Sequence, residues 1–314
     1  MRDFRRHVLR ALLPIVAVTG VLAVAGRPVR ADDPDATAPR ERCATRLSIA
    51  LLGESASDDL ITAARPQDHV ADLLENPKFA ERFARFVNAQ LNIKPGATAA
   101  DDAPYFLVKH VIANRRPWKD LFVGAYDVDA NGTVKDDPQG LGYFRSRPWM
   151  VRYAGSEGAG YRLVAAYRIL QNTTGLRFNA VTNAEDADVS AAGRTATGCK
   201  GCHYENWFAL DKVARVLPRR SGSGDAMTFT PPTDGPQQIL GGKTISDDKE
   251  LVMALVDSEA FRVNACRLAF RFLYGREEST CEAEVFDRCV EQLATKGTMH
   301  SALAAIAGDP SYCQ

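Results

Sequence analysis

The residues whose identity and spacing most clearly suggest a chemical role form one short run, Cys-Lys-Gly-Cys-His, at positions 199–203. Side chains three and four positions apart lie on one face of a helical turn. Two thiols placed in this way can each form a thioether with a vinyl group of one porphyrin, and the adjacent histidine can reach its iron. The spacing therefore predicts one covalent haem c per chain, attached to Cys199 and Cys202, with His203 as the proximal iron ligand.

Three other uses of this cysteine pair are weighed against haem attachment. A structural zinc site needs further Cys or His ligands at matched spacing, and the chain has no second C-x-x-C. A thioredoxin-like dithiol follows a strand, whereas residues 193–198 have no strand pattern. A disulfide between residues three apart has poor geometry within a helix. Haem attachment is the favoured interpretation.

A low-spin haem also needs a sixth ligand, usually Met or His. Met227 is the first candidate for the distal position, because it lies in an irregular stretch after the haem motif, followed by Phe229 and Pro231. His110, in an upstream helical pattern, is the alternative distal ligand. An open or water-bound iron is a further alternative. The other candidate ligands are Met150, Met253, Met299, His69 and His300.

These residues favour an exported haem protein that transfers single electrons, with a redox partner protein that the sequence does not identify and with no catalytic residue assigned. An open iron would instead favour a peroxidase-like haem enzyme or a haem-based ligand sensor. For that alternative, His110 with Arg115 and Arg116 is the only suitable grouping in the sequence. A third alternative is a binding module whose haem is structural.

The charge balance argues against a nucleic-acid partner. The chain of 314 residues has 39 basic and 39 acidic side chains. Residues 1–31 contain six Arg and one Asp, so the remainder has 39 − 6 = 33 basic and 39 − 1 = 38 acidic side chains, a net charge of −5. Affinity for nucleic acid depends on Lys and Arg that neutralise phosphates. The composition, 46% hydrophobic and 25% charged, is typical of a globular protein.

Residues 1–31 have the organisation of a signal peptide. A basic segment (1–10) precedes an apolar run (11–26), and small residues at Val29 and Ala31 favour cleavage before Asp32. The apolar run is 16 residues long and contains Pro14, whereas a membrane-spanning helix needs about 20 apolar residues. We therefore expect a periplasmic or secreted protein without a membrane span after cleavage. A membrane anchor and a twin-arginine export route, from Arg5-Arg6, are the alternatives.

The other five cysteines are expected to be structural. In an oxidising compartment, the four nearest the C-terminus are expected to form two disulfides, for which three pairings exist. Cys266 and Cys289 lie inside helical patterns, and Cys281 and Cys313 lie near segment ends. The favoured pairs are therefore Cys266–Cys289 and Cys281–Cys313. Cys43 is expected to be a partly buried free thiol.

Helical spacing of apolar residues dominates the chain, so the sequence predicts a mainly α fold. After the signal peptide we expect a disordered lead-in (32–42), because this stretch is polar and contains Pro. Next we expect a helical N-terminal domain (43–140). The rest of the chain (141–314) is expected to form a haem-binding and C-terminal helical domain, a bundle stabilised by disulfides. Residues 218–242, rich in Gly, Ser, Thr and Pro, are expected to form an irregular loop. Expected helices include one that opens at Pro77 and others over residues 105–113, 118–126, 160–171, 247–256, 259–274, 281–295 and 299–307.

Residues 127–132 match the opening of an EF-hand calcium loop, D-x-D-x-N-G. The twelfth position of such a loop should be a bidentate Glu, but it is Pro138. Asn131-Gly132 between short flanking runs is equally typical of a tight hairpin turn. We expect the turn, and we do not expect calcium.

A family resemblance becomes specific at the haem motif. The stretch CHYENWFALD, from Cys202 to Asp211, is similar to the haem segment of large exported proteins from planctomycetes and myxobacteria. In that family C-x-x-C-H runs into D-P-x-G-x-A-L-E-N-F-D. Phe208, Ala209 and Leu210 keep the apolar positions, and the D-P-x-G part is absent.

Two flanking stretches resemble the same family of c-type haem proteins. LLENPKFAERFA (73–84) is similar to an upstream helical domain with the motif L-L-x-x-P-x-F-x-E-R. ACRLAFRFLYGR (265–276) is similar to a C-terminal helical domain ending in Y-x-L-G-R, which this chain keeps in part. The resemblance implies a mainly helical, exported cytochrome c-like protein, and it implies no particular reaction or substrate.

Overall fold

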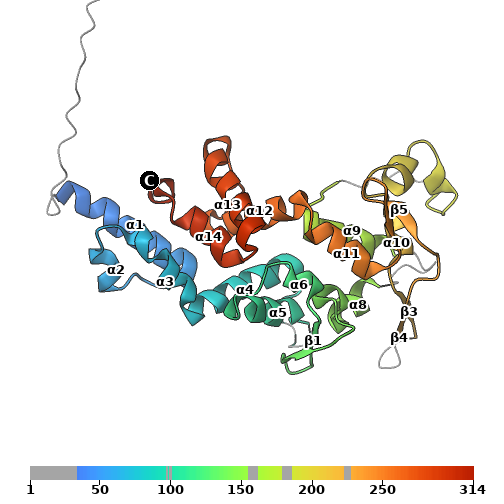
Figure 1. Cartoon of the computed structure of the whole chain (residues 1–314), viewed down its shortest axis with the longest axis horizontal. Coiled ribbons are helices and arrows are strands. Elements are labelled where there is room, and N and C mark those ends of the chain that lie inside the picture. Colours follow the sequence, from blue (N-terminus) through green and yellow to red (C-terminus); the bar gives the residue numbers. More distant parts are fainter. Residues whose placement is uncertain (1–33, 97, 99–100, 155–161, 179–185, 223–227) are drawn as a thin grey trace, which may run out of the picture.

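The structure of the protein is a computed structural model that describes residues 34–96, 98, 101–154, 162–178, 186–222 and 228–314. Over these residues the fold is mainly α, as the sequence predicts (Figure 1). The helices of the first half are α1 (Pro34–Leu52), α2 (Asp58–Thr62), α3 (Val70–Glu75), α4 (Pro77–Leu91), α5 (Ala103–Ala113) and α6 (Asp120–Val123). Those that follow are α7 (Gly142–Arg145), α8 (Arg147–Tyr153), α9 (Leu163–Thr174), α10 (Leu210–Arg215), α11 (Asp248–Val256), α12 (Glu259–Tyr274), α13 (Ala283–Lys296) and α14 (Met299–Ala307).

Helix α4 shows how local sequence sets an element. Pro77 occupies the first turn, where its missing N–H is not needed, and the Asn76 side chain accepts a hydrogen bond from Lys78 N at 3.0 Å. Phe79 and Phe83 recur at helical spacing and are fully buried. This aromatic face packs toward α12, where the Phe83 ring lies 5.0 Å from the Phe272 ring.

The C-terminal helices follow their sequence signals closely. The hydroxyl of Ser258 caps α12 by accepting from Phe261 N, and Gly275 ends the helix in the left-handed conformation at φ +71°. Gly297 ends α13 in the same way at φ +72°. The limits of α12, Glu259–Tyr274, match the expected range of 259–274.

Short hairpins account for the β structure within the described residues. Strands β1 (Tyr126–Val128) and β2 (Val134–Asp136) pair antiparallel, as do β3 (Arg219–Ser221) with β4 (Thr228–Thr230), and β5 (Gln237–Ile239) with β6 (Lys243–Ile245). The stretch 218–242, expected to be irregular, thus contains hairpin strands. Gly241 and Gly242 adopt positive φ in the β5–β6 turn, which the glycine-rich composition allows.

One continuous hydrophobic cluster joins buried residues from α1 through to the last turn of the chain. It includes Leu47 of α1, Phe83 of α4 and Tyr312 of the 3₁₀ turn Pro310–Cys313 (η6). Helix α1 contacts both α12 and η6. The core therefore continues across residue 140, and the domain boundary expected there stays a prediction from the sequence.

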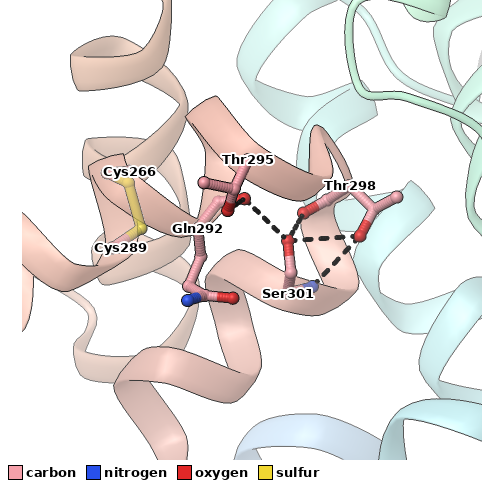
Figure 2. The surroundings of a disulfide bond; sticks show 6 residues. All are labelled: Cys266, Cys289, Gln292, Thr295, Thr298 and Ser301. Atoms are coloured by element: carbon pink, nitrogen blue, oxygen red, sulfur yellow. Dashed lines mark hydrogen bonds between the residues drawn. A yellow bond between two sulfur atoms is a disulfide. The ribbon is translucent and has the colours of Figure 1, made fainter.

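Two disulfides stabilise this arrangement, and one of them corrects the expected pairing. Cys266 of α12 bonds to Cys289 of α13, as predicted, and Figure 2 shows this bond beside the turn where Thr298 caps α14. The prediction of Cys281–Cys313 is wrong, because Cys313 bonds to Cys43. The prediction of a free Cys43 thiol is therefore also wrong, and Cys281 is free and exposed. Packing of α1 against η6 brings Cys43 to Cys313 across 270 positions, which local spacing cannot reveal.

The N-terminal segment also differs from the expectation. The predicted disordered lead-in (32–42) is helical from Pro34, because these residues continue α1 backward from its anchored part. Leu47 and Leu51 are fully buried, and extending an existing helix costs much less than nucleating one. The expected signal peptide (1–31) lies outside the described residues. Among the helices that the structure describes, none is long and apolar enough to cross a membrane.

Candidate haem-attachment site

The C-x-x-C-H run adopts the helical turn that its spacing predicts. His203 N donates to Cys199 O at 3.2 Å, which places these two residues on one side of the turn. The turn then widens into a π-helical segment, Gly201–Glu205 (η3), in which Asn206 N donates to Gly201 O at 2.8 Å. Such π turns are rare and are frequent at functional sites.

Both cysteines of the run are available for attachment. Cys199 and Cys202 are free thiols and are exposed, whereas Cys266 and Cys289 are fully buried in a disulfide. Cys281 is the third free and exposed thiol within the described residues. The free cysteines therefore lie at the surface, whereas the disulfide-bonded cysteines are buried or, for Cys313, partly buried.

The imidazole of His203 is held by a buried carboxylate. Its Nδ1 lies 2.6 Å from Oδ2 of Asp211 on α10. An ionised carboxylate can only accept hydrogen bonds, so Nδ1 carries the hydrogen and donates. The other ring nitrogen, Nε2, is thereby left as the basic atom that can bind iron.

Asp211 is itself paired with Arg194, which precedes the run. Arg194 Nη2 donates to Oδ1 at 2.8 Å, and Arg194 Nε lies 3.1 Å from Oδ2 and 3.2 Å from Oδ1. Both side chains are almost fully buried, at 6% and 7% exposure, while His203 is 22% exposed. The guanidinium compensates the charge of the buried carboxylate, which would otherwise be costly to remove from water.

Helix α10 explains why Asp211 points inward. Leu210, Val213 and Ala214 are buried on the same short helix, which packs against α9 and the π turn. Asp211 therefore lies on a face fixed by the hydrophobic core. Burial, followed by the negative charge of Asp211, raises the pKa of the neighbouring Tyr204.

Apolar side chains are exposed beside this turn. Trp207, four positions after His203, is 45% exposed, and Val189, whose carbonyl accepts from Arg194 Nη1 at 2.6 Å, is 62% exposed. The Trp207 ring packs edge-on against Phe208, which stacks on Phe178 at 5.5 Å. Exposed aromatic and aliphatic surface next to the cysteines suits an apolar porphyrin.

Of the two distal candidates, only His110 lies within the described residues, and it is on a helix that packs away from His203. Met227 lies outside the described residues. His110 lies on α5, with its ring 5.3 Å from that of Tyr126, and burial lowers its pKa. Helix α5 packs with α4, α6 and α7, whereas the π turn contacts α10. Figure 1 shows α5 and α10 in separate parts of the fold.

The remaining distal candidates are distributed through the fold. Met150 and Met299 are buried in the core, and Met253 is exposed on α11 at 39%. His69 ends a 3₁₀ turn, and His300 packs its ring 5.5 Å from that of Phe79. Within the described residues, none of these five has a hydrogen bond or ring contact with residues 199–203.

The motif that resembles an EF-hand loop forms a hairpin, as predicted. The Asp129 carboxylate accepts from Asn131 N and Thr133 N, both at 2.9 Å, and closes the turn between β1 and β2. Lys135 pairs with the same carboxylate at 2.7 Å. Within the part of the chain that the structure describes, no group of three or more His, Cys, Asp or Glu side chains is arranged to hold a metal ion.

Sequence reasoning missed Asp211 and Arg194. Asp211 lies eight positions after His203 and directly after three apolar residues, Phe208 to Leu210. An acidic residue directly after this apolar run was a usable signal, because a carboxylate that is buried with its apolar neighbours needs a partner. Arg194 carried no local signal, since only the folded chain shows what it contacts.

Comparison with known proteins finds no match to a family model, to a curated protein or to a solved structure. The chemistry of the site itself therefore carries the functional interpretation.

Proposed function

We propose that this chain is an exported c-type haem protein that transfers single electrons, of the kind that its motifs resemble in planctomycetes and myxobacteria. One observation carries the proposal. The C-x-x-C-H run presents two free, exposed thiols on a helical turn, while the Nδ1 of its histidine is engaged by Asp211. This arrangement leaves Nε2 for iron, as expected of a proximal ligand.

The residues fit covalent attachment of haem. Each thiol, Cys199 and Cys202, would add across a vinyl C=C bond, with a new C–S bond at one carbon and the hydrogen at the other. This addition needs no external oxidant or reductant. When bound, haem supplies an iron that accepts and donates one electron. His203 would hold the iron through Nε2, the ring nitrogen that its contact with Asp211 leaves free.

Export is supported by the other cysteines. Disulfides persist in oxidising compartments and are rare in the cytosol, and the structure has two of them, Cys43–Cys313 and Cys266–Cys289. The signal-peptide pattern of residues 1–31 leads to the same location. We propose that the mature protein is periplasmic or secreted and begins at Asp32.

A specific observation also favours a second candidate function, a haem enzyme. A proximal imidazole that donates to a carboxylate is a more basic ligand. A more basic ligand stabilises oxidised iron, which suits a haem enzyme as well as an electron carrier. His203 and Asp211 have that geometry. Binding of carbon monoxide to the reduced protein separates the two functions, because an electron carrier with two axial ligands resists it and an open iron accepts it.

The deciding experiment is attachment of haem in a host that exports the chain and supplies haem-attachment machinery. The wild-type protein is compared with the Cys199→Ala/Cys202→Ala variant, and Cys281→Ala is the matched control, since Cys281 is the other free and exposed thiol within the described residues. After acid denaturation and solvent extraction, wild type and control should keep their haem, and the double variant should lose it. Mass spectrometry should give the mass of the chain from Asp32 plus one haem.

Two results would contradict the proposal. One is a double variant that keeps haem through denaturation, and the other is a wild-type protein that leaves the same host without haem.

A further inference from the structure

A buried carboxylate, that of Asp211, contacts the Nδ1 atom of the His203 ring at 2.6 Å. We infer that Asp211 is a positioning residue, which fixes the His203 imidazole through Nδ1 and so lowers the reduction potential of the haem iron. This inference rests on the proposed function and adds a determinant of its redox property.

The geometry gives Asp211 a firm hold on the ring. The Nδ1–Oδ2 distance of 2.6 Å is short for a hydrogen bond from nitrogen to oxygen, as expected when the acceptor is charged. The carboxylate is 7% exposed, so water does not compete for it. Because α10 is fixed by its buried neighbours Leu210 and Val213, the carboxylate cannot follow the ring if the ring rotates. The hydrogen bond therefore selects one tautomer and one orientation.

Arg194 stabilises the buried Asp211 carboxylate that holds the His203 ring. Its guanidinium contacts both carboxylate oxygens of Asp211 and also donates to Val189 O. The positive charge of Arg194 offsets the cost of burying the Asp211 carboxylate. The carboxylate can therefore stay ionised beside the His203 imidazole although it is almost fully buried.

The consequence for iron follows from electrostatics. A hydrogen bond to a carboxylate makes the imidazole a stronger donor than a hydrogen bond to a neutral group does. The oxidised iron carries one more positive charge than the reduced iron, so it gains more from this donor. The negative charge of Asp211 thus favours the ferric state, and the potential falls.

The test is a potentiometric titration of haem-loaded variants. In Asp211→Asn the neutral amide keeps the size of the side chain and loses its charge, and the potential should rise by at least 59 mV, a tenfold change in the one-electron equilibrium. Asp211→Ser is a second neutral variant with the same expected direction. Asp211→Glu restores the charge and should return the potential toward that of the wild type.

The chain provides a matched control in Asp248. This carboxylate is buried to a similar degree, at 6% exposure, and forms a two-contact pair with Arg145 at 2.8 and 3.0 Å, but it lies on α11 and does not contact His203. Asp248→Asn therefore removes an equally buried carboxylate charge from a pair with Arg, although Arg145 is 27% exposed whereas Arg194 is 6% exposed. Its potential should stay within the error of the wild-type value, even if its stability falls as much as that of Asp211→Asn.

The outcomes separate this inference from the proposed function. A haem-loaded Asp211→Asn protein with the wild-type potential, or with the same shift as Asp248→Asn, overturns the role of Asp211 alone. A wild-type chain without covalent haem overturns both proposals. If both neutral variants fail to load haem while Asp211→Glu and Asp248→Asn load normally, the positioning of His203 by the carboxylate is supported.

Discussion

Removing the Cys43–Cys313 disulfide should destabilise the protein more than removing Cys266–Cys289. The first bond closes a loop of 270 positions between α1 and η6, and the second closes one of 23 positions between neighbouring helices. The perturbation is a pair of double variants, Cys43→Ala/Cys313→Ala and Cys266→Ala/Cys289→Ala. Cys281→Ala serves as the control, because Cys281 is a free thiol.

The expected magnitudes follow from the loop lengths. Loop-closure entropy of the unfolded chain gives about 5–6 kcal/mol for 270 positions and about 3–4 kcal/mol for 23, a difference of about 2 kcal/mol. Loss of the fully buried Cys266 and Cys289 sulfurs also removes core packing, which narrows this difference in free energy. The denaturant dependence of unfolding is free of that effect, because it reports the surface exposed by the unfolded chain.

Urea unfolding followed by far-UV circular dichroism provides both quantities. Without the long loop closure, the unfolded chain expands further, so the m-value of Cys43→Ala/Cys313→Ala should rise clearly above that of the wild type. The m-value of the short-loop variant should rise much less, and Cys281→Ala should match the wild type. An unchanged m-value and midpoint in Cys43→Ala/Cys313→Ala would refute the reasoning, as would alkylation of Cys43 in the unreduced native protein.

Two further predictions concern the iron and the acid range. In the haem-loaded protein, Met227→Ala should open the iron to carbon monoxide and lower its reduction potential, because Met favours ferrous iron; an unchanged spectrum would reject Met227 and make His110→Ala the next variant to measure. The pKa of Glu282 is lowered to about 2, mainly by hydrogen bonds from Arg276, so its carboxylate stabilises the fold above about pH 4.5 and this contribution is lost as the pH falls toward 2. Glu282→Gln should therefore cost about 1–2 kcal/mol at pH 7 in urea unfolding, with the difference from wild type shrinking at pH 3, and a difference independent of pH would contradict the assignment.

The sequence was sufficient where local chemistry determines structure. Pro77 with Asn76 starts α4, and Gly275 ends α12, because caps and stops act within one helical turn. The helical turn of residues 199–203 is local in the same sense. The main helices and the placement of the cysteine pair on one turn could therefore be predicted.

The parts that could not be predicted depend on contacts between distant residues. Cys43 meets Cys313 only because α1 packs against the end of the chain. Asp211 meets Arg194 only because α10 folds back over the segment before the cysteines. No periodicity or motif encodes such contacts, since they arise from how whole helices pack.

Under the proposed export, the Cys43–Cys313 bond has a consequence for the order of events. In a chain translocated from its N-terminus, Cys43 emerges first and its partner emerges last, since they are separated by 270 positions. In the oxidising compartment proposed for the mature protein, the unpaired Cys43 would then coexist with the free thiols of Cys199 and Cys202. Conversion of those two thiols to thioethers before Cys313 arrives would remove them as competing partners. Early haem attachment would then favour the correct Cys43–Cys313 disulfide over mispaired bonds to Cys199 or Cys202.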